Sequence, residues 1–198
     1  GDELTIDDIG WMGSQPTLHE KAAMVGVADV RPSADLEKYL ASAGKCGQNI
    51  GYLPLYRAAH SLKLLRLLGV KPGDEKPSIP MIRAIVDMRN HKTAEEIAEI
   101  ERACDVTADM HIAAIRMLRP GMRECEVSAR IQEVAEAAGM RLSFPTIATV
   151  NGQTLHNHYH GNIAKSGQML LVDAGAETEM GYAGDMSSTI CVDPKFTA

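Results

Sequence analysis

The sequence has 198 residues, of which 45% are hydrophobic and 23% charged, as in ordinary globular proteins. Its net charge of −6, without a run of Lys or Arg, argues against a nucleic-acid surface. No apolar stretch approaches membrane-spanning length, and the first residues do not resemble a signal peptide. We therefore expect a protein that binds neither nucleic acid nor membrane. Because the four cysteines are scattered, with no Cys-x-x-Cys pair, we also expect reduced thiols in a cytoplasmic protein.

Residues 1–80 have the character of a first, α/β domain. The run 22–30 indicates the end of a helix followed by a strand, and helices are predicted over 33–43 and 55–68, each followed by a glycine. The Pro- and Gly-rich run 71–80 marks the end of this domain. We assign residues 81–92 to a linker, with a short strand at 81–86, and residues 93–198 to a second domain.

The second domain is predicted to begin with two helices. Thr93 and Glu96 have the spacing of a capping box, and an amphipathic stripe follows as far as Leu118. His111 lies on this stripe, where a buried core histidine is more common than a ligand. A second helix is predicted over 124–138, and the β-prone run 142–150 contains Pro145, which favours an edge strand or a bulge.

Two short β-type runs, 169–172 and 182–192, flank a polar segment with glycines and predict an antiparallel hairpin. Asp173 and Asp185 are 12 residues apart, so a turn centred near Glu179 would place them directly opposite each other on one face. Two facing carboxylates repel unless a cation lies between them, and oxygen ligands suit hard divalent ions. The alternative is that each aspartate bonds its own backbone at a strand end.

Three histidines, His156, His158 and His160, alternate just before this hairpin. In an extended strand they would share one face, a geometry suited to zinc. This leaves open a histidine-rich, single-metal hydrolase whose site is completed by Asp173. It also leaves open an ordinary surface loop in which histidine is merely tolerated.

The segment Asp-Ala-Gly at 173–175, followed by Gly-Tyr-Ala-Gly-Asp at 181–185 and a Ser/Thr-rich strand, resembles the first metal-binding hairpin of the pita-bread metallopeptidases. This family includes Xaa-Pro aminopeptidases, prolidases and methionine aminopeptidases. The resemblance implies that Asp173 and Asp185 bind a pair of divalent metals, such as Mn, Co or Zn. It also implies that His156, in a Leu-His pair, is catalytic: it contacts the substrate and helps to stabilise the tetrahedral intermediate. No such role follows for His158 or His160.

The implied architecture is an α/β N-terminal creatinase-like portion followed by the first half of an α+β pita-bread domain. The implied activity is cleavage before proline, in a peptide with proline at the second position, by a two-metal-activated water in a homo-oligomer such as a dimer. The family completes its metal site with a later His and two later Glu residues. We therefore expect an internal piece that is inactive alone. A catalytically dead binding or scaffold protein on the same fold remains the alternative.

Overall fold

The computed structural model describes residues 3–196, and the chain divides into two compact units, Gly1–Asn90 and His91–Ala198. The helices of the first unit are α1(Ile6–Met12), α2(Leu18–Met24), the 3-10 helix η1(Ser33–Asp35), α3(Leu36–Lys45), α4(Ala58–Leu68) and α5(Ile79–Asn90). Helices α3 and α4 pack on each other and correspond to the two helices predicted there. In residues 3–196 no helix combines the length and the apolar character needed to cross a membrane.

Two predictions for the first unit were wrong. No residue between 3 and 90 lies in a strand, so the strand expected before Arg31 is irregular backbone. The strand expected at 81–86 belongs to α5, which takes up most of the predicted linker. The reason is a local start signal, because the Ser78 hydroxyl accepts a hydrogen bond from the Met81 amide (3.3 Å) and Pro80 fits a first helical turn.

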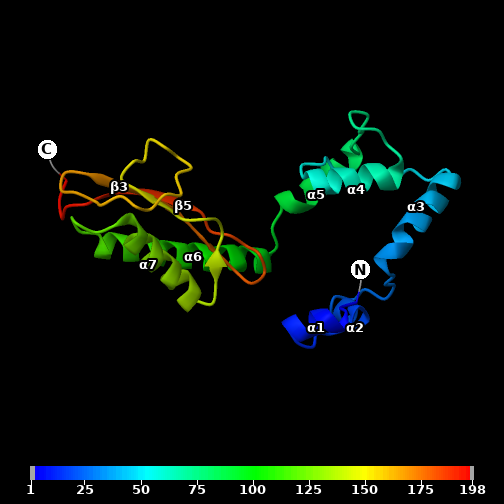
Figure 1. Cartoon of the computed structure of the whole chain (residues 1–198), viewed down its shortest axis with the longest axis horizontal. Coiled ribbons are helices and arrows are strands. Elements are labelled where there is room, and N and C mark those ends of the chain that lie inside the picture. The colour runs from blue at the N-terminus through cyan, green and yellow to red at the C-terminus, as the bar shows by residue number, and fades with distance from the viewer. Residues whose placement is uncertain (1–2, 197–198) are drawn as a thin grey trace. The chain divides into compact units, whose positions relative to one another are not determined.

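The second unit contains two long helices and two small antiparallel sheets. Its elements are α6(Ala94–Met117), α7(Glu124–Ala137), β1(Arg141–Leu142), β2(Ile147–Thr149), β3(Met169–Ala174), β4(Ala176–Glu177) and β5(Met186–Cys191). The strand order is β2-β3-β5 in one sheet and β1-β4 in the other. Both helices lie on one side of strands β3 and β5 (Figure 1). The other face of this sheet is therefore free of helices within the unit.

Local signals of the second unit were predicted correctly. The Thr93 hydroxyl accepts from the Glu96 amide (3.3 Å), and the Glu96 carboxylate accepts from the Thr93 amide (2.8 Å), which confirms the capping box. The run 142–150 is interrupted around Pro145, and its second piece, β2, is an edge strand. These features fix where α6 begins and where the three-stranded sheet ends.

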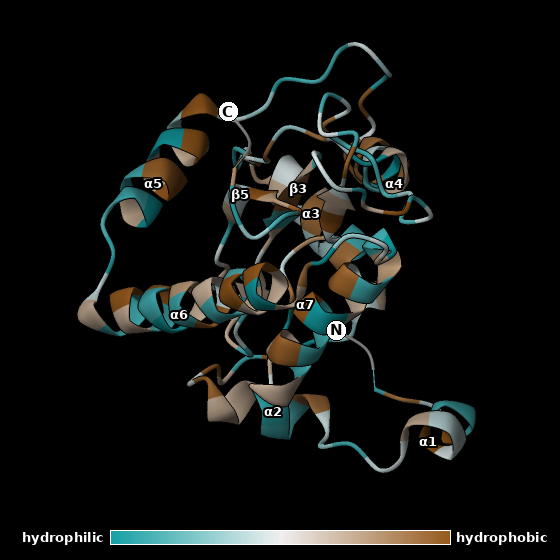
Figure 2. Ribbon diagram, turned by 90° about the vertical axis from the view of Figure 1, so that its left-hand side faces the viewer, coloured by the Kyte–Doolittle hydropathy of each residue, from teal (hydrophilic) through white to brown (hydrophobic). Residues whose placement is uncertain are grey.

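The core of the second unit lies between the two helices and the three-stranded sheet. Residues in this core that are fully shielded from solvent include Met110, Val127, Ile131, Leu170 and Val172. Alternating hydrophilic and hydrophobic residues along α6 are visible in Figure 2. This pattern turns one face of the helix toward the core, and that core supports the strand that carries Asp173.

Candidate metal centre

The two aspartates lie on the hairpin formed by β3 and β5, but they do not pair directly. Asp173 pairs with Ser187, and Asp185 lies just before β5, so the predicted direct pairing was wrong by two residues. The turn is centred one residue later than expected, where Gly181 adopts a φ of 81° and donates to the Thr178 carbonyl (2.9 Å). Because side chains alternate along a strand, an offset of two residues leaves both aspartates on the same face.

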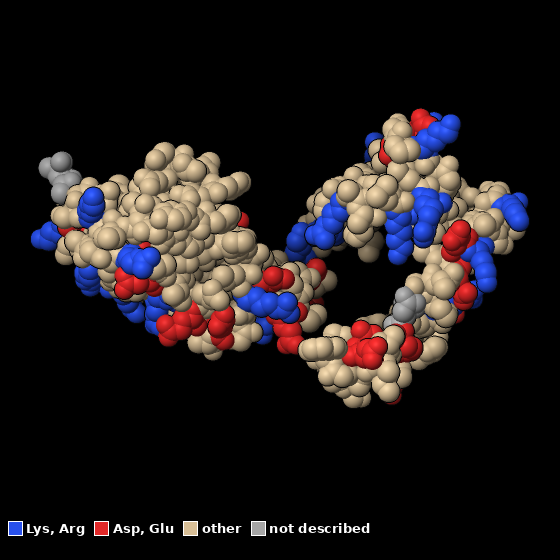
Figure 3. Space-filling model, viewed as in Figure 1, with Lys and Arg blue, Asp and Glu red and all other residues tan. Residues whose placement is uncertain are grey.

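Both aspartates line one cavity of about 370 Å³. Its other lining residues are Phe144, Pro145, Ile147, His156 and His158. Asp173 is half-buried, whereas Asp185, just before β5 at the turn end of the hairpin, is exposed. In the view of Figure 3, most charged side chains of this unit lie along α6 and α7. The side that carries the sheet and the loop 150–162, here called the histidine loop, is mostly uncharged in this view. The cavity therefore combines two acids with an apolar wall.

One carboxylate oxygen of Asp173, Oδ1, is buried and has no hydrogen-bond donor in the structure. A carboxylate is an acceptor only, and burying an acceptor without a partner is unfavourable by about 1–3 kcal/mol. A cation would satisfy this oxygen, and with Asp185 it would find two hard oxygen ligands. The residues therefore fit a divalent metal, although they supply only part of its coordination shell.

The histidines do not lie in the extended strand that the single-metal alternative required, because residues 150–162 are an irregular loop. Asn157 helps to turn the chain, since its side-chain oxygen accepts from the Tyr159 amide (3.0 Å). His156 and His158 are exposed and line the cavity, whereas His160 is not among the lining residues. Within residues 3–196 no three His, Cys, Asp or Glu side chains are grouped as metal ligands, so the single-metal alternative lacks its ligand set there.

A buried histidine of α6, His111, contacts the opposite face of the hairpin. His111 is 3% exposed, with Nδ1 2.7 Å from the Ser188 hydroxyl and Nε2 3.3 Å from the Ala174 carbonyl oxygen. The carbonyl can only accept, so Nε2 carries the proton and Nδ1 accepts from Ser188. This confirms His111 as a satisfied core residue. It also shows that one imidazole connects the two strands beside Asp173.

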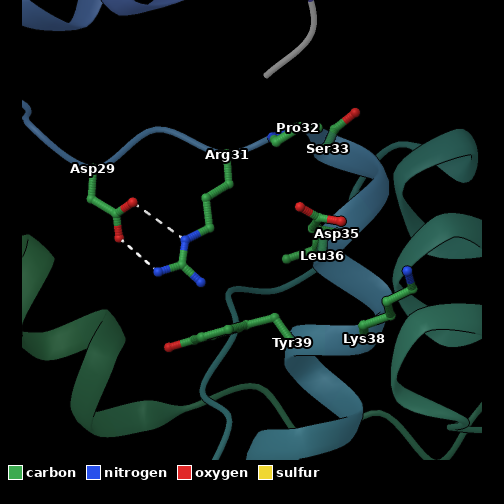
Figure 4. Close-up of a pocket in the computed structure, with 8 residues that line it drawn as sticks. All are labelled: Asp29, Arg31, Pro32, Ser33, Asp35, Leu36, Lys38 and Tyr39. Carbon is green, nitrogen blue, oxygen red and sulfur yellow. Dashed lines mark hydrogen bonds and ion pairs between the residues drawn. The ribbon is translucent and has the colours of Figure 1, made fainter.

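A larger cavity, of about 670 Å³, belongs to the first unit and contains none of the predicted site residues. Figure 4 shows Asp29, Arg31 and Tyr39 among its lining residues. The Arg31 guanidinium donates to the Asp29 carboxylate at 3.0 and 3.3 Å, and this hydrogen bond raises the pKa of Arg31. Because its arginine is already paired and its lining is exposed, this cavity does not compete with the aspartate pair as a chemical site.

Comparison with known proteins identifies the class. Residues 98–198 match metallopeptidase family M24, and the chain belongs to this family. It is 37% identical to the Xaa-Pro aminopeptidase of Escherichia coli (strain K12) over 116 residues, which cover 56% of this chain and 26% of that protein. It is 32% identical to a probable Xaa-Pro aminopeptidase of Chaetomium globosum over 194 residues, 94% of this chain and 31% of that protein.

The chain also resembles part of a solved aminopeptidase structure. Proline aminopeptidase P II from Yersinia pestis matches with a TM-score of 0.78 and 26% identity, over 98% of this chain and 46% of that one. The chain thus has part of the pita-bread fold, as predicted. It spans about a quarter to a half of the length of these relatives. Membership of a metallopeptidase family implies a divalent metal cofactor, in agreement with the buried oxygen of Asp173.

Proposed function

We propose that this chain forms part of the active site of a proline-specific metallopeptidase, an Xaa-Pro aminopeptidase or a prolidase. One observation carries the proposal: Asp173 and Asp185 line the same cavity as His156, and a buried oxygen of Asp173 lacks a donor. The names of the relatives, which are Xaa-Pro aminopeptidases, support the specificity for proline. The substrate is then a peptide with proline at the second position.

In this proposal Asp173 and Asp185 are ligands of two divalent metals, Mn, Co or Zn, and further ligands come from sequence outside these 198 residues. When bound, such a metal pair supplies a water activated for attack on a carbonyl. His156 donates a hydrogen bond to the oxygen on which negative charge develops. Phe144, Pro145 and Ile147 supply an apolar wall, and water displaced from this wall by a bound peptide would strengthen the electrostatic contact.

The test is hydrolysis of an Xaa-Pro peptide by the full-length protein, with Mn, Co or Zn added and with a chelator as the blank. Asp173→Asn and Asp185→Asn should each lower kcat/KM on the order of 100-fold or more, because each removes a charged ligand. Asp105→Asn is the matched control: Asp105 is exposed on α6, so this variant should retain activity.

The same assay separates the alternatives. Hydrolysis that survives the chelator and both aspartate variants would disprove the metallopeptidase proposal. Binding of the Xaa-Pro peptide without turnover at any metal concentration would favour the binding or scaffold protein. Cleavage of an Xaa-Ala peptide at the rate of the Xaa-Pro peptide would refute the specificity for proline while leaving the metal site in place.

A further inference from the structure

We propose that Glu124 is a positioning residue whose buried carboxylate holds both ends of the loop 151–161 and thereby places His156 at the cavity. The inference rests on the proposed function only for the role of His156. The loop itself and its attachment to Glu124 are features of the fold. A residue on α7, far from the hairpin in sequence, would then control the geometry of the site.

Glu124 is the first residue of α7 and is 0% exposed. Its charge lies at the N-terminus of the helix, where the helix dipole and the free amides favour an anion. Burial of a carboxylate is unfavourable unless its oxygens are fully hydrogen-bonded. The partners of Glu124 therefore explain how the fold tolerates it.

Those partners lie at the two ends of the histidine loop. The Val150 amide donates to Oε1 (2.8 Å) and the Asn162 amide donates to Oε2 (3.1 Å). The Asn162 side-chain amide lies 3.0 Å from both oxygens. One side chain thus closes the loop where it leaves β2 and where it returns, as in a compact surface loop whose ends meet.

The helix backbone reinforces the returning end. The Glu124 amide donates to the Asn162 carbonyl (3.0 Å), and the Cys125 amide donates to the His160 carbonyl (3.1 Å). These bonds use amides at the start of α7 that have no partner within the helix. The end of the loop therefore caps the helix, and the first side chain of the helix clamps the loop.

Two hydrogen bonds within the loop join residues close in sequence. Thr154 donates its amide to the Asn151 carbonyl (3.0 Å), and Tyr159 donates to the Asn157 side chain. Such local turns shape the loop but do not locate it on the sheet. The Asn157 side-chain amide also reaches the Thr149 hydroxyl on β2 (3.5 Å), at the long limit of a hydrogen bond. The position of the loop, and so that of His156, therefore depends mainly on the ends that Glu124 holds.

Amide hydrogen exchange in the full-length protein tests the clamp without reference to activity. Glu124→Ala and Glu124→Gln should speed exchange at Val150 and Asn162 by about tenfold or more, since the acceptor is lost or weakened. Glu126→Gln is the matched control, because Glu126 lies in the same helical turn, is exposed and accepts from the Arg123 amide. Unchanged protection at both amides in the Glu124 variants would overturn the proposal.

Asn162→Ala is a second variant in case the Glu124 substitutions do not fold. It removes the side-chain bonds to Glu124 and leaves the backbone amide in place. It should loosen the returning end of the loop more than the end at Val150. Protection unchanged from the wild type at both the Val150 and the Asn162 amide would again contradict the clamp.

A double-mutant cycle tests the consequence for catalysis. Glu124→Gln should lower kcat about 10- to 100-fold and leave KM within about twofold of the wild-type value. The reason is that a displaced His156 loses a hydrogen bond that it makes mainly in the transition state. In a His156→Ala background the same change should lower kcat less than about twofold. An equal loss in both backgrounds would show that Glu124 does not act through His156. An inactive wild-type enzyme would refute the proposed function alone, since the exchange experiment still decides the clamp.

Discussion

Replacement of Thr107 by valine should weaken the second unit by removing one hydroxyl at the base of the hairpin. Thr107 is 1% exposed, and its Oγ1 donates to the Ala103 carbonyl (2.7 Å) and accepts from the Ala176 amide (3.0 Å). Valine preserves the shape but leaves the fully buried Ala176 amide without this acceptor. The free energy of unfolding should fall by about 1–3 kcal/mol.

Serine at the same position gives the opposite perturbation. It keeps the hydroxyl and both hydrogen bonds but removes one methyl group, which lowers stability by about 1 kcal/mol. Thr107→Val should therefore be less stable than Thr107→Ser, although valine is the more hydrophobic residue. Thr189→Val is the control: Thr189 is exposed on β5, so the change should stay within about 0.5 kcal/mol.

The assay is urea unfolding followed by far-UV circular dichroism, with hydrogen exchange of the β3 and β5 amides to assign the transition to the second unit. A Thr107→Val variant as stable as the wild type, or more stable than Thr107→Ser, would refute the reasoning. It would mean that the Ala176 amide finds another acceptor and that the contact between α6 and the hairpin is adaptable.

Four further predictions concern the proposed site and the residues that support it. Asp173→Asn should be at least as stable as the wild type in the presence of a chelator, because it removes a buried charge, but thermal shift assays should show no stabilisation by added metal. Hydrogen bonds from Thr93 and then Tyr182 lower the pKa of Glu96, so its contribution is present at neutral pH and lost as the pH falls through that lowered value. Glu96→Gln should therefore reduce the drop in melting temperature between neutral and acidic pH. His158→Ala should leave metal affinity nearly unchanged in calorimetric titration, and a large loss of affinity would contradict the assignment of ligands. These 198 residues alone should not cleave an Xaa-Pro peptide with Mn, Co or Zn, and turnover by the chain alone would contradict the same assignment.

The structural features that the sequence predicted correctly depend on residues close together in the chain. The capping box of Thr93 and Glu96 spans one helical turn, and the hairpin of Asp173 and Asp185 is a contiguous segment. Their spacing was enough to predict a shared face. The register was predicted wrongly, because it depends on which glycine of the turn adopts a positive φ, and Gly181 does so.

Glu124 could not have been predicted from local pattern. It lies 26 residues from Val150 and 38 from Asn162, and in sequence it is simply an acid at the start of a helix, where acids are common. Only the return of the loop onto α7 brings these groups together. The alternation of the three histidines could not decide between a strand and a loop for a related reason: side-chain bonds such as that of Asn157 compete with strand pairing and have no periodicity.

The alternation of β3 explains how chemistry and stability are combined in one strand. Leu170, Val172 and Ala174 are buried in the core, whereas Asp173 faces the cavity between two of them. The position of the carboxylate is therefore set by the packing of its neighbours against the helices and by the imidazole of His111. Because close-packed interiors transmit small shifts, a core substitution on α6 should change metal affinity without touching a ligand. In the proposed site Asp173 and Asp185 supply the ligand oxygens, and core residues outside the motif, with His111, set where the Asp173 carboxylate lies.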